Sequence, residues 1–192
     1  NGTLKISRGS VQLSSTGSTA LDLNGGNINV VAGGNVQVAG ATDFNAAQTL
    51  FINNATLETD QLTNASGIVG TIQLNDPASG HALSVGINNG SSAFSGIIQD
   101  AAGGTGSVYK TGTGTLTLNG ASTYSNGTLI DAGTLSLGNS SALGTGTVTI
   151  GGASTTLKFA TTGLTVANAI NLQTNILSTT VTGSVTESGV IT

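Results

Sequence analysis

The sequence contains no cysteine, no methionine and no tryptophan, and it has a single proline, Pro77. Without cysteine the chain can form neither a disulfide nor a thiolate metal site, and it has no catalytic thiol. Only 3% of the residues are aromatic and 6% are charged, whereas an ordinary soluble domain is about 25% charged. Because large aromatic side chains are so few, we do not expect the chain to fill a wide globular core.

Positive charge is also scarce. The chain has eight acidic residues and only four basic ones, Lys5, Arg8, Lys110 and Lys158, which lie far apart. This spacing argues against nucleic-acid binding through neutralisation of phosphates. No run of 18 apolar residues occurs, so no membrane-spanning helix is expected. We therefore expect neither nucleic acid nor a membrane as a direct partner of this segment.

Glycine and short alternating segments dominate what is present. The 192 residues include 30 glycines, and 37% of the chain is hydrophobic. Apolar residues alternate with small polar ones in many short segments, for example at 116–118, 134–137 and 148–150. This alternation predicts strands with one inward face, separated by turns rich in Gly, Asn, Ser and Thr.

Strands of this length and spacing are compatible with a β-sandwich or with a parallel β-helix. Most segments are too short to span a sandwich, tight hairpins are scarce, and the polar positions carry almost no Lys or Glu. Ser, Thr and Asn stack well at the ~4.8 Å strand spacing, whereas like charges would repel. We therefore expect an all-β fold, a parallel β-helix (β-solenoid), formed by residues 1–192 as one domain. At about 21 residues per rung, the 192 residues give roughly nine rungs.

Turn residues indicate where the rungs change direction. Asn-Gly pairs are the best candidates for corners with unusual backbone angles, because Gly and Asn tolerate positive φ. The four pairs considered are Asn24-Gly25, Asn89-Gly90, Asn119-Gly120 and Asn126-Gly127. Residues 76–81, which hold the only Pro and the only His, are expected to form a protruding loop, and residues 100–106 a long turn.

One stretch, residues 109–150, resembles a known repeat. The resemblance is carried by TGTGTLTLNG at 111–120, TYSNGT at 123–128, IDAGTLSLG at 130–138 and NSSALGTG at 139–146. These segments resemble the autotransporter-associated β-strand repeat, which is found in the passenger domains of bacterial autotransporters. The flanking residues are similar to the repeat only in their general residue composition.

The resemblance implies a structural role outside the cell. It implies a right-handed β-helix, in agreement with the general preference of parallel crossovers. It also implies a stalk or passenger segment that serves as an adhesion or display scaffold, secreted or anchored at the outer membrane of a Gram-negative bacterium. A ligand on a host or neighbouring cell would be its partner. Both ends of the sequence lie within strand patterns, so we expect the chain to be part of a longer protein. The resemblance implies that this longer protein has a signal sequence upstream and a membrane β-barrel downstream.

Two other functions are compatible with the same pattern. The ends of a β-helix offer unpaired backbone groups, so head-to-tail self-association into an extracellular filament is one alternative. A polysaccharide-active β-helix enzyme is the second alternative, and it would need paired carboxylates or a carboxylate cluster with a cation.

Candidate catalytic residues are few. His81 is the only imidazole, and Asp76, Ser79 and Ser84 are close to it in sequence. A general base needs such a neighbour, but the simplest interpretation of His81 is an exposed loop histidine. Tyr109 and Tyr124 are the only tyrosines, so no aromatic platform for sugar stacking is expected.

The carboxylates do not form an evident site either. Glu58 and Asp60 are neighbours that would point to the same side of an extended strand, and Asp22 and Asp43 could lie one rung apart. The simplest interpretation is that these carboxylates are solvated outward residues. The Gly-Gly pairs lack the Asp that a calcium-binding β-roll requires. We therefore predict a protein that is not an enzyme, with no catalytic, cofactor-binding or metal-binding residues and no cofactor.

Overall fold

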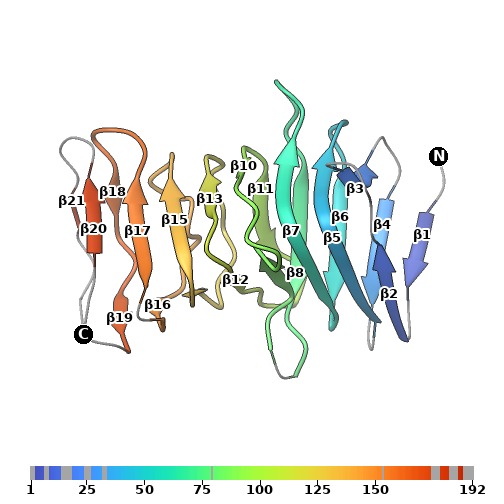
Figure 1. The fold of residues 1–192 in the computed structure, drawn as a ribbon. Coiled ribbons are helices and arrows are strands. Elements are labelled where there is room, and N and C mark those ends of the chain that lie inside the picture. The colour runs from blue at the N-terminus through green and yellow to red at the C-terminus, as the bar shows by residue number, and fades with distance from the viewer. Residues whose placement is uncertain are drawn as a thin grey trace.

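The structure is a computed structural model that describes residues 3–6, 9–13, 19–23, 27–31, 34–78, 80–152, 154–173, 178–181 and 186–187. Its strands stack one after another along a single axis, from β1 near the N-terminus to β21 near the C-terminus (Figure 1). Every pairing described between these strands is parallel. The expected all-β parallel solenoid is therefore confirmed, and its right-handed sense stays a prediction. Among the described residues there is no helix that could cross a membrane.

Three sheets form the sides of the solenoid, and we name them A, B and C. In stacking order, sheet A contains β1 (Thr3–Ile6), β4 (Asn27–Val31), β6 (Thr49–Asn53), β8 (Thr71–Asn75) and β11 (Ile97–Asp100). Sheet B contains β2 (Gly9–Leu13), β5 (Gly34–Phe44), β7 (Thr56–Asn64), β9 (Leu83–Val85), β12 (Val108–Lys110), β14 (Thr128–Ile130), β16 (Val148–Ile150) and β19 (Ile170–Leu172), with β3 (Thr19–Leu23) paired to β5. Sheet C contains β10 (Ser92–Phe94), β13 (Thr115–Leu118), β15 (Gly133–Leu137), β17 (Thr155–Phe159) and β20 (Ser178–Val181). A separate pair joins β18 (Thr165–Val166) to β21 (Thr186–Glu187).

Sheet B gives the number of coils. Its path through the described residues stacks eight strands. The chain advances by different amounts from one coil to the next: the step from Val108 to its partner Thr128 is among the shortest, and the step from Leu57 to Leu83 is the longest on this path. The prediction of nine rungs is therefore slightly too high. The rung length assumed from the sequence is close to that of the shortest coils. Other coils contain extra loop residues, so the same number of residues forms fewer coils than predicted.

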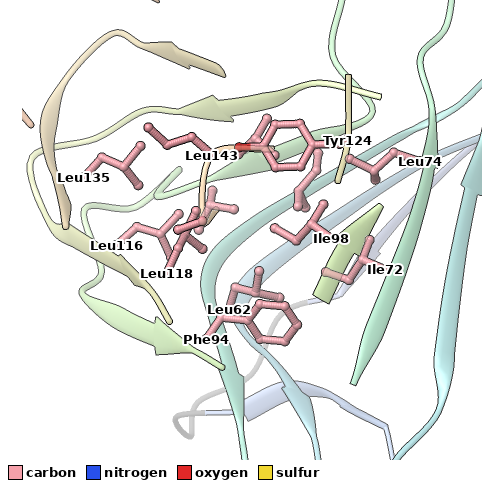
Figure 2. Close-up of a cluster of buried hydrophobic side chains, with 14 of the residues drawn as sticks. Leu62, Ile72, Leu74, Phe94, Ile98, Leu116, Leu118, Tyr124, Leu135 and Leu143 are labelled. Carbon is pink, nitrogen blue, oxygen red and sulfur yellow. The ribbon is translucent and has the colours of Figure 1, made fainter. Parts of the chain in front are cut away.

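The interior is a narrow column of aliphatic side chains. In sheet A, Leu50 pairs with Ile72, and Ile72 with Ile98, and all three are at most 1% exposed. Leu116, Leu135 and Leu157 repeat this arrangement in sheet C. Figure 2 shows inward side chains from different coils packed against one another, including Leu62, Phe94 and Leu118. Each such side chain contributes about 1.5–3 kcal/mol when it leaves water, so the predicted inward positions explain what holds the coils together.

The corners follow the predicted turn chemistry where they are described. Asn89 has a φ of 70° and Gly127 a φ of 89°, both in the left-handed region. A side chain at Gly120 would collide with the backbone oxygen of Gly96 in the preceding coil. These positions therefore need Asn or Gly because of backbone angle or close approach. The predicted corner at Asn24-Gly25 lies outside the described residues.

Both predicted interruptions of the strand pattern occur in the structure, and hydrogen bonds fix them to neighbouring coils. The segment between β8 and β9, which contains Pro77 and His81, projects beyond the stacked strands (Figure 1). The turn after β11 is closed by the Asp100 carboxylate, which accepts hydrogen bonds from the backbone N–H of Gly106 (2.7 Å) and Ser125 (3.1 Å). The second bond crosses to the next coil, so the turn is fixed to its neighbour.

Candidate functional site

The outer face of sheet B carries a group of polar side chains near a groove. Because side chains alternate across a strand, the residue between two inward positions faces out. In successive strands from β9 to β16 these outward positions are paired, and they are Ser84, Tyr109, Leu129 and Thr149. A strip of hydroxyl, aromatic and aliphatic groups therefore runs along the solenoid axis.

His81 stacks on this strip. Its ring lies 5.2 Å from the ring of Tyr109, with an angle of 24° between the two planes. Its Nδ1 atom is 2.7 Å from Oγ of Ser107. His81 is half-buried, so the expectation of an exposed loop histidine is wrong. The loop folds back onto the strip because the Tyr109 ring offers the imidazole a stacking surface.

Tyr109 is held on its other side by a carboxylate. Its hydroxyl donates a 2.9 Å hydrogen bond to Oδ2 of Asp131. Partial burial raises the pKa of Tyr109 above 10, and the neighbouring charge of Asp131 adds to this effect. The phenol therefore stays protonated at neutral pH and acts as a donor to Asp131.

Asp76 fixes the loop to the coils that follow. Its Oδ1 accepts hydrogen bonds from the backbone N–H of Ala82 and of Ser107, each 2.9 Å long, and its Oδ2 accepts from Nδ2 of Asn126 at 2.7 Å. Hydrogen bonds to a carboxylate are among the stronger ones in proteins. Three successive coils are therefore joined at one side chain, and this places His81 over sheet B.

A groove of about 260 Å³ lies beside this group. Its walls include His81, Ser107, Asn126, Leu129, Thr147, Thr149 and Gln173. We call it the sheet B groove. It runs across the strands, because these residues belong to successive coils. None of the side chains named here is an acid, a lysine or an arginine, so the groove presents mainly hydroxyl, amide and imidazole groups.

The Ser107 and His81 pair does not complete a catalytic constellation. A nucleophilic serine needs a base that is itself oriented by a third group. Here Asp76 contacts the backbone N–H of Ser107 rather than the imidazole, and Ser107 is only 2% exposed. Ser84 lies on the outer strip, and the placement of Ser79 falls outside the described residues. The arrangement can bind a ligand through hydrogen bonds, but it lacks an activated nucleophile.

Several carboxylates in the described coils join coils to one another. Asp22 and Asp43 are register partners, as predicted, and Asp43 accepts a hydrogen bond from Oγ1 of Thr63 in the following coil (2.8 Å). Glu58 accepts from Nε2 of Gln37 in the preceding coil (2.9 Å). For Asp43 and Glu58, these bonds replace the solvated role that we expected from the sequence.

Glu58 and Asp60 do not act as a pair. Asp60 is only 9% exposed, and its Oδ1 accepts from the backbone N–H of Asn88 and of Gly90, both at 2.8 Å, in the coil after its own. Glu58 instead bonds to the coil before. Within the described ranges no group of three or more His, Cys, Asp or Glu is placed to hold a metal ion.

Lys110 has a structural role that the sequence pattern did not predict. It is completely buried, and its ammonium donates to the carbonyl oxygens of Thr111, Gly112 (2.8 Å) and Ala132 (3.3 Å). Burial lowers the pKa of Lys110 to about 8, and the carboxylate of Asp60 opposes this shift. The position of Lys110 in its strand could have indicated that it is buried. Lys110 lies two residues after the inward Val108, and side chains two apart in a strand point to the same side.

Tyr124 is the second residue whose role was missed. It is fully buried in the core, where Figure 2 shows it among the aliphatic side chains. Its hydroxyl lies 2.6 Å from Oγ1 of Thr128, and burial raises its pKa above the ordinary value. Of the two tyrosines, only Tyr109 is therefore on the surface, beside the sheet B groove.

Residues 108–137 match the family model described as Passenger-associated-transport-repeat. This range begins with β12 and ends with β15, so the repeat covers about one and a half coils. The chain is also similar to the adhesin BmaC autotransporter of Brucella suis biovar 1 (strain 1330), with 36% identity over 105 residues. The aligned part covers 51% of this chain and 3% of that relative. No solved structure matches the chain.

These findings agree with the resemblance seen in the sequence. The residues that match the Passenger-associated-transport-repeat model form coils of a parallel β-solenoid. Because the chain spans only a small fraction of its relative, the activity and partners of the whole protein are matters for proposal.

Proposed function

We propose that this chain is a β-solenoid segment of an autotransporter passenger, displayed on the surface of a Gram-negative bacterium as a structural, adhesive scaffold. The observation that carries the proposal is the position of the repeat at residues 108–137, which lies in register with coils before and after it. A segment whose strand pairing continues on both sides is suited to extending a stalk. The relative is named an adhesin, and this supports the adhesive part of the proposal.

The physical properties of the solenoid suit this role. Each coil is bonded to the next through the backbone, and the buried aliphatic columns repeat with every coil, so the stability grows with length. Seven steps along sheet B, from β2 to β19, extend over about 34 Å at ~4.8 Å per step. The segment therefore supplies reach and stiffness while its outer faces remain available for contacts.

We propose a non-enzymatic role for the segment. The support is chemical, since the His81 and Ser107 pair is not oriented by a carboxylate and the carboxylates described above bond to neighbouring coils. The proposed partner is a molecule on the surface of a host cell or of a neighbouring bacterium. Head-to-tail self-association stays a prediction, and electron microscopy would reveal it as long uniform fibres instead of short rods.

Bead adhesion tests the proposed function. Fluorescent beads coated with the 192-residue chain are applied to epithelial cells and to bacteria, and the retained beads are counted. Beads coated with the chain should be retained several-fold more than beads coated with Leu135→Asp, which places a charge in the buried column. Equal retention of the two kinds of bead on all tested surfaces would contradict the adhesive role.

A further inference from the structure

We infer that the sheet B groove is a binding site for a short, uncharged oligosaccharide chain lying along the solenoid axis. The inference rests on the adhesive role proposed above and deepens it, because it names a site and a ligand class. The observations that support it are the shape of the groove, its charge and the chemistry of its walls.

The shape favours an extended occupant. The walls draw on five stacked levels of the solenoid, from His81 beside β9 to Gln173 after β19. Four steps at ~4.8 Å separate the first of these levels from the last by about 19 Å. A volume of about 260 Å³ spread over this length leaves room for a thin chain and not for a compact ligand. A chain of pyranose rings has such a form.

The charge favours an uncharged occupant. Two carboxylates bond to its surroundings: Asp76 holds Asn126 in the groove wall, and Asp131 holds Tyr109 on the neighbouring strip. Among the described residues no lysine or arginine lines the groove, and Lys110, which is close to it in sequence, is buried in the interior. A polyanion would therefore meet negative potential without a compensating cation.

The wall chemistry favours hydroxyl groups as partners. Thr147 and Thr149 provide hydroxyls, and Asn126 and Gln173 provide amides, all of which can both donate and accept hydrogen bonds. Asn126 is held by Asp76 through Nδ2, so its carbonyl oxygen is oriented before a ligand arrives. Such preorganisation reduces the entropy that binding costs.

A peptide is a less suitable occupant. Peptides bind to sheets mainly by adding a strand to an open edge, but β14 and β16 beneath the groove are paired on both sides. Among the side chains that line the groove, Leu129 is the aliphatic one, whereas a peptide would need several apolar pockets. Peptide binding is therefore kept as an outcome of the test.

The test is a titration of the isotope-labelled 192-residue chain followed by NMR spectroscopy. The probes are cellotetraose, maltotetraose, N-acetylchitotetraose and lacto-N-tetraose, with a heparin tetrasaccharide as the acidic comparison and an alanine-serine octapeptide as the peptide. At least one neutral probe should shift the amide signals of residues 126–129 and 147–149, with a dissociation constant of about 1 mM or tighter.

Three variants identify the site. Thr149→Arg and Thr147→Arg each place a long side chain in the groove and should weaken binding of that neutral probe at least tenfold. Thr117→Arg is the matched control, because Thr117 lies in β13 of sheet C, away from the groove. The dissociation constant of the neutral probe for this variant should equal that for the unmodified chain. Far-UV circular dichroism confirms that each variant is folded, and the two groove variants are independent of one another.

Several results would overturn the inference. They are the absence of any shift with all four neutral probes at about 10 mM, tighter binding of the heparin fragment or of the peptide at the groove, and equal affinity in both groove variants and the unmodified chain. Bead adhesion of the unmodified chain, compared with its titration, separates the two proposals. If these beads adhere while the groove of the unmodified chain binds no neutral probe, the groove assignment fails and the adhesive role stands. If the groove binds as expected and the beads do not adhere, the adhesive role fails.

Discussion

Lys110 gives the sharpest quantitative prediction, because it is a buried cation inside an aliphatic column. Its register partners in the neighbouring strands are Val85 and Ile130. The ammonium is held by carbonyl oxygens of Thr111, Gly112 and Ala132. The perturbation is a change of pH from 7 to 9.5, applied to the unmodified chain and to Lys110→Met.

The sign follows from the direction of the pKa shift. The folded state lowers the pKa of Lys110 from 10.5 to about 8, so between these values the unfolded chain binds more protons than the folded one. The free energy of unfolding therefore rises with pH across this interval. From pH 7 to pH 9.5 the two pKa values give a rise of about 2 kcal/mol, at about 1.36 kcal/mol per unit.

Two tyrosines act in the opposite direction but weakly. The folded state raises the pKa of Tyr109 and of Tyr124, so their contribution to stability begins to be lost as the pH approaches the unfolded value of about 10. At pH 9.5 the two together remove at most about 0.3 kcal/mol. Lys110→Met retains both tyrosines, so the difference between the two proteins isolates the lysine.

The assay is urea unfolding followed by far-UV circular dichroism, because the chain has no tryptophan for fluorescence. The unmodified chain should gain about 2 kcal/mol between pH 7 and pH 9.5, which moves its midpoint by about 1 M urea. Lys110→Met should show no such gain, while Lys158→Met, which changes an outward lysine of β17, should keep it. A flat profile in the unmodified chain, or the same gain in Lys110→Met, would refute the account of Lys110 as a desolvated cation.

Three further predictions concern the core and the loop that covers sheet B. Leu118→Asp or Leu137→Asp introduces a charge into the buried apolar column and should prevent folding, and normal protease resistance in either variant would show that these positions do not face inward. Tyr124→Phe removes the hydrogen bond to Thr128 and should lower the free energy of unfolding by about 0.5–1.5 kcal/mol; an unchanged urea midpoint would mean that the hydroxyl contributes nothing. Asp76→Ala removes three hydrogen bonds that the carboxylate accepts, so hydrogen exchange of the amides of Ala82 and Ser107 should accelerate at least tenfold. Exchange of the amides of β13 should be unaffected. Equal protection of Ala82 and Ser107 in both proteins would show that Asp76 does not fix the loop.

Much of the fold could be predicted from the sequence because strand alternation and turn chemistry are local. The alternation at 116–118 and 148–150 identified inward side chains that are buried in the structure, such as Leu116 and Ile150. The Asn-Gly pairs at residues 89 and 126 identified corners with positive φ. The pairing of Asp22 with Asp43 could also be predicted, since it needed only the approximate length of a coil.

The candidate site could not be predicted in the same way. His81 and Tyr109 belong to successive coils, and their stacking depends on how a loop of irregular length folds over the next coil. Asp76 reaches Asn126 two coils away, through a geometry that local sequence patterns do not contain. For this reason local sequence patterns predict solvated carboxylates, whereas Asp43, Glu58 and Asp60 join the coils.

By itself the sequence determined that the chain is a thin, parallel β-solenoid without disulfides or a large aromatic core. The physical reason is that composition and a period of two act on neighbouring residues and need no knowledge of distant ones. Only the tertiary structure decided that Lys110 is buried, that the carboxylates bond across coils, and that a groove opens beside His81 and Thr149. These features depend on which residues of neighbouring coils lie opposite one another. Loop residues inserted into a coil change that register, so the features form only when the coils stack.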